Sequence, residues 1–130
     1  MRVLIADDSE LLVERLVAAL AKVSGIEIVG QAGTGEEALM AIRRLNPDVV
    51  ILDICMPLGS GIDVLEGMEK DHLTPLVIVL TNYSYSLYSK KCLQSGAKFF
   101  FDKSTEFQKV PEVLRSLVPL PDLQIPKEAM

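Results

Sequence analysis

The sequence predicts an α/β fold in which a five-stranded parallel sheet is covered by helices on both faces. Two observations lead to this prediction. Short apolar runs with the length of buried strands recur along the 130-residue chain, which has the size of a single domain. Between them lie stretches in which apolar positions return every three or four residues, as on the buried face of a helix. Regular alternation of this kind favours a parallel sheet, because right-handed crossovers leave few other arrangements.

Five apolar runs are the predicted strands. Four of them lack polar interruptions and are expected to be central strands, buried on both faces: Val3 to Ala6, Val49 to Leu52, Leu76 to Leu80 and Phe99 to Phe101. The fifth run, Ile26 to Gln31, carries Glu27 among apolar neighbours. That alternation is typical of a strand with one side near solvent. We therefore expect this run at an edge of the sheet.

The first two predicted helices carry recognisable start and stop signals. Apolar positions recur with helical spacing from Leu11 to Leu20, and Ser9 stands where an N-cap is expected. Thr34 and Glu37, three residues apart, match the capping-box pattern at the start of the second helix. Asn46-Pro47 is expected to end that helix, since the residue before a proline disfavours helical geometry.

Three further helices complete the predicted alternation. The third begins at a cap on Ser60 and runs to about Lys70, and the fourth runs from about Tyr83 to Ser95 before Gly96 ends it. The last is expected from Val110 to Val118, because Pro111 is tolerated in the first turn of a helix but would break one begun at Thr105.

Five βα units in sequence predict the flavodoxin-like doubly wound fold, a three-layer (βα)5 sandwich with strand order 2-1-3-4-5. The predicted domain covers residues 1–118. After Val118 the chain is proline-rich, with Pro119, Pro121 and Pro126, and too short for another element. We therefore expect residues 119–130 to be a C-terminal tail or a truncated linker.

Composition excludes several classes of function. The net charge of −5 provides no basic surface to neutralise phosphates, so direct nucleic-acid binding by this chain is not expected. The two cysteines, Cys55 and Cys92, match no disulfide or zinc pattern, and no apolar run is long enough to cross a membrane. These features favour a cytoplasmic protein. The single histidine, His72, is expected at the surface without a role.

Polar residues follow four of the predicted strands at the points where they end. These residues are Asp7, Asp8, Asp53, Thr81 and Lys103. Because the carboxyl ends of parallel strands meet at one edge of the sheet, where ligands bind in such folds, these side chains can converge on one pocket. The predicted site therefore combines three carboxylates, one hydroxyl and one ammonium group.

Three carboxylates in one pocket repel one another unless a cation holds them ionised. Mg²⁺ suits such a site, because it prefers oxygen ligands and bridges carboxylates to phosphate oxygens; Mn²⁺ is the alternative. With the metal bound, Asp53 can attack phosphorus as a nucleophile and form an acyl phosphate. Lys103 and Thr81 would then contact the remaining phosphoryl oxygens.

Four segments, in this order and spacing, resemble the receiver domains of two-component response regulators, including chemotaxis receivers. They are LIADDS at residues 4–9, DVVILDICMPLGSG at 48–61, VIVLT at 77–81 and SGAKFFFDKS at 95–104. The resemblance extends from Arg2 to about Val118. It implies that Asp53 is the phosphoacceptor and that Asp8, Asp53 and the backbone carbonyl of Cys55 ligate the metal. It also implies that Asp7 acts mainly through a water molecule.

The resemblance further implies a conformational switch. Thr81 and Lys103 would surround the phosphoryl group, and Phe100, three positions before the lysine, would change rotamer as the Thr81 hydroxyl moves. Many receivers have tyrosine at the position of Phe100. Without that hydroxyl, the coupling is expected to be weaker or purely steric.

Some features allow two interpretations. Taken singly, Asp7-Asp8 is typical of a helix start, Thr81 of a helix cap and Lys103 of a solvated surface group; only their common position at the sheet edge favours a site. Tyr83, Tyr85 and Tyr88 gather in one short stretch. They are interpreted either as ordinary helix packing or as a face on which a partner docks.

The leading functional hypothesis is a phosphorylation-dependent signalling switch rather than a metabolic enzyme. It would accept a phosphoryl group from a sensor histidine kinase or phosphotransfer protein and alter a surface that binds a downstream effector or output domain. It could be a stand-alone receiver or the N-terminal piece of a longer regulator, and either a monomer or a phosphorylation-dependent dimer.

Two alternatives belong to other classes. A Mg²⁺-dependent phosphatase with an aspartyl nucleophile would need a general acid near Asp53 and a cap over its substrate, yet position 55 carries a thiol. A flavin-binding domain would need a glycine- and hydroxyl-rich phosphate loop after the first strand, where Asp7 and Asp8 stand instead.

Overall fold

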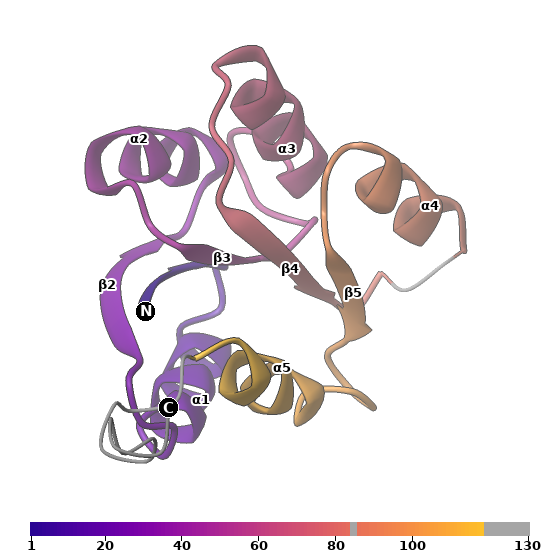
Figure 1. Ribbon diagram of the computed structural model, residues 1–130. Helices are drawn as coiled ribbons and strands as arrows, with labels where there is room; N and C mark the ends of the chain where they lie inside the picture. Colours follow the sequence, from indigo (N-terminus) through magenta and orange to yellow (C-terminus); the bar gives the residue numbers. More distant parts are fainter. Residues whose placement is uncertain (84–85, 119–130) are drawn as a thin grey trace, which may run out of the picture.

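The computed structural model describes residues 1–83 and 86–118, in which five strands and five helices alternate (Figure 1). The elements are β1 (Arg2–Ala6), α1 (Glu10–Leu20), β2 (Glu27–Ala32), α2 (Gly35–Leu45), β3 (Val49–Leu52), α3 (Gly61–Lys70), β4 (Leu76–Thr81), α4 (Ser86–Gln94), β5 (Phe99–Asp102) and α5 (Lys109–Leu117). Every strand pairing is parallel, and the order is β2-β1-β3-β4-β5. The predicted fold is therefore confirmed.

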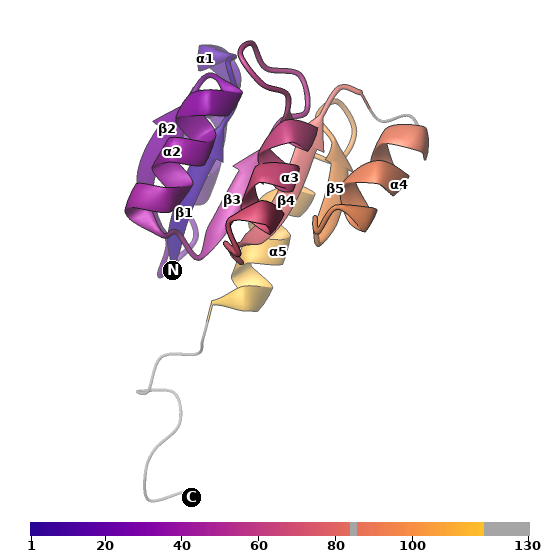
Figure 2. The same ribbon diagram turned by 90° about the horizontal axis from the view of Figure 1, so that it is seen from above.

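The sheet lies between two helical layers, with α2, α3 and α4 on one face and α1 and α5 on the other (Figures 1 and 2). Alternate residues of the central strands point into opposite layers. In β1, Leu4 belongs to the core under α2, α3 and α4, whereas Val3 and Ile5 belong to the core under α1 and α5. Burial on both faces explains why the central strands read as unbroken apolar runs.

The two outer strands differ in how well the sequence predicted them. β2 pairs only with β1 and is largely half-buried or exposed, so the expected edge position is confirmed. The expectation that Phe99 to Phe101 forms a central strand is wrong, because β5 is the other edge of the sheet and all its residues are half-buried. Large aromatic side chains can cover the sheet end while keeping one side near solvent; Phe99 and Phe101 stack at 5.8 Å between ring centres.

The helix starts follow the predicted caps, with one difference. The Ser9 and Thr34 hydroxyls accept hydrogen bonds from the N–H groups of Leu12 and Glu37, and Ser60 forms a capping box with Asp63. The capping box predicted a hydrogen bond from the N–H of Thr34 to the Glu37 carboxylate. The carboxylate instead accepts from the N–H of Gly33, one residue before the cap, at 3.2 Å.

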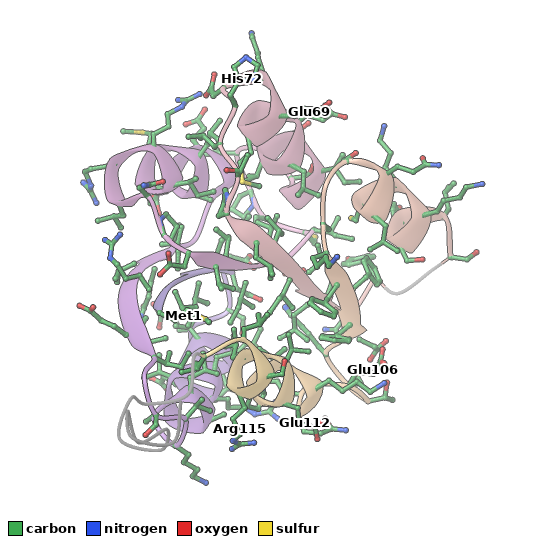
Figure 3. The ribbon with its side chains drawn as sticks, viewed as in Figure 1. Met1, Glu69, His72, Glu106, Glu112 and Arg115 are labelled. Carbon is green, nitrogen blue, oxygen red and sulfur yellow. The ribbon has the colours of Figure 1, made fainter. Side chains whose placement is uncertain are left out.

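The helix ends also match the sequence in most cases. Asn46 ends α2 in the left-handed conformation, and Gly96, with φ of +108°, follows α4. α5 lies within one residue of its predicted bounds, with Glu112 and Arg115 on its outer side and Leu114 buried (Figure 3). The fourth helix was predicted too long: Tyr83 is not helical, and α4 is described from Ser86 onward.

Other expectations concern the surface and the chain end. His72 lies exposed just after α3, at the periphery of the molecule near Glu69 (Figure 3). Tyr85 and the predicted tail, residues 119–130, lie outside the described residues. Within the described ranges, no helix has both the length and the apolar character required to cross a bilayer.

The loop that follows Asp53 is attached to the start of α2. The N–H groups of Gly35 and Glu36 donate to the carbonyls of Pro57 and Leu58 at 3.1 and 2.9 Å. These are N–H groups of a first helical turn, which have no partner within their own helix. These two hydrogen bonds to α2 hold the loop after Asp53 in place.

This contact requires glycine at position 35, because a Cβ there would collide with the carbonyl oxygen of Gly59. We predict that Gly35→Ala lowers the free energy of unfolding by about 1–3 kcal/mol through overpacking. Urea denaturation would measure the change. Gly33→Ala is the matched control, since its Cβ would lie 3.9 Å from the Asp8 Cα, an ordinary contact. Equal stability of the two variants would contradict the prediction.

Candidate functional site

The acidic residues are positioned by the strands that precede them. The N–H of Asp7 donates to the Ala32 carbonyl at 2.8 Å, and the N–H of Asp53 donates to the Ala6 carbonyl at 2.9 Å. Sheet-like pairing therefore continues one residue beyond β1 and β3. As a result, both carboxylates start from the same edge of the sheet, as the sequence predicted.

The three predicted carboxylates do meet. One oxygen from each of Asp7, Asp8 and Asp53 lies within 4.8 Å of the other two. Asp7 and Asp53 are only 6% and 4% exposed, whereas Asp8 is exposed. The cluster therefore has a buried floor and one side that faces solvent.

Lys103 bridges the two buried carboxylates. Its Nζ lies 2.7 Å from Asp7 Oδ2 and 3.0 Å from Asp53 Oδ2, and its side chain is 12% exposed. Burial opposes the charge of Lys103, but the hydrogen bond to Asp7 and the charge of Asp53 outweigh it, so the pKa of Lys103 is raised. The ammonium group therefore stays protonated between them. The sequence placed Lys103 at this edge but did not predict its pairing with Asp7.

Backbone groups also hold the carboxylates. The N–H of Ser9 donates to Asp7 Oδ1 at 2.8 Å, and the N–H of Cys55 donates to Asp53 Oδ1 at 3.3 Å. Burial raises the pKa of Asp7, the hydrogen bonds from Lys103 and Ser9 oppose this rise, and the charge of Asp53 adds to it. At Asp7, burial therefore outweighs these hydrogen bonds and disfavours the charged carboxylate.

This donor set fits a hard divalent cation. Three carboxylates face one lysine, which leaves two negative charges uncompensated, and all the candidate ligand atoms are oxygens. A cavity of about 680 Å³ adjoins the acids and is lined by residues that include Asp7, Asp8, Glu10 and Glu14. The open side next to Asp8 leaves room for the water ligands that Mg²⁺ keeps.

The two predicted switch residues lie on β4 and β5. Thr81 ends β4 and is fully buried, and its hydroxyl oxygen accepts from the N–H of Tyr83 at 3.2 Å. Because Asn82 and Tyr83 are not helical, Thr81 closes a local turn and is not the cap of α4. Phe100 pairs in register with Val79 and packs, half-buried, against the core beneath α4.

Asp102 stands beside Lys103 in sequence but has a different position. Its Oδ1 accepts hydrogen bonds from the N–H groups of Ser104 and Thr105, at 2.7 and 3.1 Å. It thereby shapes the turn that leads from β5 toward α5. Asp102 is not among the three acids that could share one ion.

One contact at the pocket mouth was missed from the sequence. The Tyr83 side chain lies close to the thiol of Cys55, which is exposed. The interaction with Cys55 is the main cause of a raised pKa of the Tyr83 hydroxyl, and burial and the charge of Asp53 add to it. The periodicity placed Tyr83 on a helix, and no local sequence signal indicated that it faces the loop after Asp53.

Comparison with known proteins gives consistent results. The model of the family "Response regulator receiver domain" matches residues 3–115. An uncharacterized transcriptional regulatory protein of Bacillus subtilis, YvfU, is 36% identical over 118 residues, which cover 91% of this chain and 59% of that protein. This chain thus spans little more than half the length of that curated relative.

Two solved structures share the fold and part of the sequence. A DNA-binding response regulator of the LuxR family from Staphylococcus aureus has a TM-score of 0.82 at 28% identity, covering 89% of this chain and 97% of that one. CheY of Borrelia burgdorferi, solved in a CheX-CheY-BeF3-Mg²⁺ complex, has a TM-score of 0.75 at 35% identity, covering 88% and 89%. With the family match over most of the chain, these likenesses show that this chain belongs to the response regulator receiver domains of two-component systems.

Proposed function

We propose that this chain is a phosphorylation-dependent switch whose phosphoacceptor is Asp53. The observation that carries the proposal is the meeting of three carboxylates from two strand ends, with Lys103 bridging Asp7 and Asp53. In the reaction, an oxygen of Asp53 forms a bond to phosphorus as the bond from phosphorus to the donor nitrogen breaks. The donor imidazole keeps the electron pair and takes up a proton.

Asp8, Asp53 and the Cys55 carbonyl would hold a Mg²⁺ ion, with Asp7 acting mainly through water and Mn²⁺ as a substitute. Such an ion neutralises charge on the phosphoryl oxygens and on the carboxylates. The Mg²⁺ and BeF3 in the structure of the Borrelia burgdorferi complex support this assignment. Partial exposure of Asp8 supports it too, because the ion must enter from solvent.

Lys103 would contact a second phosphoryl oxygen, exchanging part of its present contact with Asp53 for the new charge. The buried Thr81 hydroxyl would donate to a third oxygen, and Phe100 would change rotamer to follow it. Because Phe100 lacks a hydroxyl, its movement depends on packing alone. The half-buried position of Phe100 at the sheet edge supports such a movement.

The phosphoryl group would come from a histidine kinase or phosphotransfer protein, and the altered surface would bind an effector or output domain. YvfU, a transcriptional regulatory protein, extends well beyond the matched region, and the Staphylococcus aureus relative is a DNA-binding regulator. Both support a link to an output domain. The receiver family is not one of metabolic enzymes, so the phosphatase alternative loses its support.

The test is incubation of the purified chain with phosphoramidate in the presence of Mg²⁺, followed by intact-mass spectrometry. We expect the mass to increase by one phosphoryl group, and the gain to disappear when EDTA removes the metal, because the uncompensated acids repel the donor. Beryllium fluoride (BeF3⁻), added in place of phosphoramidate, should stabilise the fold only when Mg²⁺ is also present. Absence of labelling in Mg²⁺ would refute the proposed function.

A further inference from the structure

The cavity of about 680 Å³ beside the acids is lined by charges of one sign only. It lies between α1 and the end of β2 and is called here the α1–β2 cavity. Its carboxylates are those of Asp7, Asp8, Glu10 and Glu14. No basic side chain from residues 1–83 or 86–118 lines it, whereas a second cavity includes Lys103 in its lining. The α1–β2 cavity therefore favours a cationic occupant.

The local structure of α1 does not explain the charges of Glu10 and Glu14. Glu10 stands in the first helical turn, where the positive end of the helix stabilises a carboxylate, but Glu14 lies one turn further on. At a spacing of four residues the two carboxylates repel each other. Both are exposed, and none of the ion pairs in the described part of the chain involves either of them. The neighbouring Arg15 lies over the ring of Phe107, 4.5 Å from its centre. An external cation would relieve the repulsion.

The floor of the α1–β2 cavity is apolar, and one side of it is an open edge of the sheet. Val13 and Ala32 are buried and Val17 is half-buried, so the carboxylates stand around an apolar base. Gln31 and Gly33 bring the end of β2 to the cavity. Among the described strands, β2 pairs only with β1 and lies at the outside of the sheet (Figures 1 and 2). Its outer side can therefore accept an added chain.

We propose that the α1–β2 cavity binds an extended basic segment of a partner protein, with lysine or arginine at alternate positions. Alternate side chains of an extended chain point the same way and recur about 6.6 Å apart. Glu10 and Glu14 are four helical residues apart, a rise of about 6 Å, so two alternate cations match them. The alkyl part of a lysine would cover Val13 and Val17 while its ammonium group reaches a carboxylate. This binding does not depend on the proposed phosphorylation.

Charge disfavours the other macromolecular occupants. A second copy of this chain carries a net charge of −5, and nucleic acids are polyanions. Residues 119–130 contain one cation, Lys127, and two acids, Asp122 and Glu128, so this segment lacks a pair of cations. A small polycation such as spermidine would satisfy the carboxylates but would gain nothing from the open edge of β2. A basic protein segment therefore fits more of the observed features.

The test measures binding of a fluorescein-labelled peptide in which three lysines alternate with valines, by fluorescence anisotropy at low salt. The comparison peptide has the same composition, but its three lysines are consecutive. We expect the alternating peptide to bind more tightly, and its affinity to fall as sodium chloride screens the charges. Ala18→Arg should abolish binding, because it places a bulky cation in the cavity from an exposed position on α1.

The double variant Glu10→Gln with Glu14→Gln should bind the alternating peptide about fivefold more weakly, the effect expected from the loss of two exposed ion pairs. Glu69→Gln with Glu112→Gln is the matched control, because it removes the same charge from exposed positions on α3 and α5 (Figure 3). This control should bind like the unchanged chain. Circular dichroism checks that each variant folds.

Three results would overturn the proposal. Equal weakening in the two double variants would reveal attraction by net charge alone, and equal affinity for the two peptides would remove the extended segment. Displacement of the peptide by spermidine at an equal concentration of charge would assign the cavity to a small polycation. Phosphoramidate labelling is measured separately on the unchanged chain. Labelling without peptide binding removes this inference alone, and peptide binding without labelling removes the proposed function alone.

Discussion

Asp53→Asn is expected to abolish phosphoryl labelling of this chain by phosphoramidate in Mg²⁺. The amide that replaces the carboxylate has no anionic oxygen to form a bond with phosphorus, and it is a poor ligand for the metal. The variant should still fold, because the side chain keeps its size and can still accept the Cys55 N–H. The Lys103 ammonium loses its ion pair with position 53 but keeps the one with Asp7, at 2.7 Å.

Intact-mass spectrometry reads this result directly, and circular dichroism checks the fold. Asp71→Asn is the matched control, since Asp71 lies after the far end of α3, where it pairs with Arg43. This variant should label like the unchanged protein. Labelling of Asp53→Asn at the normal rate would transfer the role of phosphoacceptor to another carboxylate.

Asp8→Ala is expected to remove Mg²⁺ binding while the metal-free domain remains as stable as before, or becomes more stable. Asp8 is the exposed member of the three acids, so its removal leaves no cavity in the core. It also relieves a repulsion of about 1 kcal/mol for two charges about 4 Å apart in water. On this prediction the fold does not depend on the Asp8 carboxylate, whereas metal binding does.

Thermal or urea unfolding with and without Mg²⁺ measures this effect. Saturating metal should raise the free energy of unfolding of the unchanged chain, by about 2.7 kcal/mol at a hundredfold excess over the dissociation constant. Asp8→Ala should lose that increase. Glu14→Ala, a carboxylate in the same cavity but outside the three-acid cluster, should retain it. A collapse of the Asp8→Ala fold would instead assign Asp8 a structural role.

The two ionic partners of Lys103 explain how three acids can lie together in one pocket. The lysine lies between the two buried acids and offsets part of their repulsion, and the third acid faces solvent, where water screens it. Under the proposed function, a cation held at the exposed side would leave Lys103 free to contact a phosphoryl oxygen. The acids therefore already lie together before a ligand binds, so ligand binding does not carry the cost of assembling them.

Local patterns were sufficient for most of the secondary structure. The caps at Ser9 and Ser60 and the helix end at Asn46 depend on side-chain and backbone groups a few residues apart, so the sequence carries them directly. The same locality explains the error at Glu37. The pattern predicts a reciprocal cap but not which neighbouring N–H the carboxylate selects, and here it is that of Gly33.

The errors at β5 and α4 have a different origin. An apolar run such as Phe99 to Phe101 indicates burial, but whether a strand lies at the centre or edge depends on the partners it meets. Tyr83 suited the helical spacing that follows it, yet its N–H is bonded to the Thr81 hydroxyl and its side chain lies close to Cys55. Both outcomes depend on segments distant in the chain.

By itself, the sequence determined the alternating elements, the edge of the sheet at which the chemistry gathers, and the identities of Asp7, Asp8, Asp53, Thr81 and Lys103 as residues that end strands there. Only the tertiary structure decided that Lys103 bridges Asp7 as well as Asp53 and that Tyr83 reaches Cys55. The physical reason is range. Backbone periodicity and capping act within a few residues and leave a pattern in the sequence, whereas ion pairing and ring contacts depend on distances between side chains that only the packed fold sets.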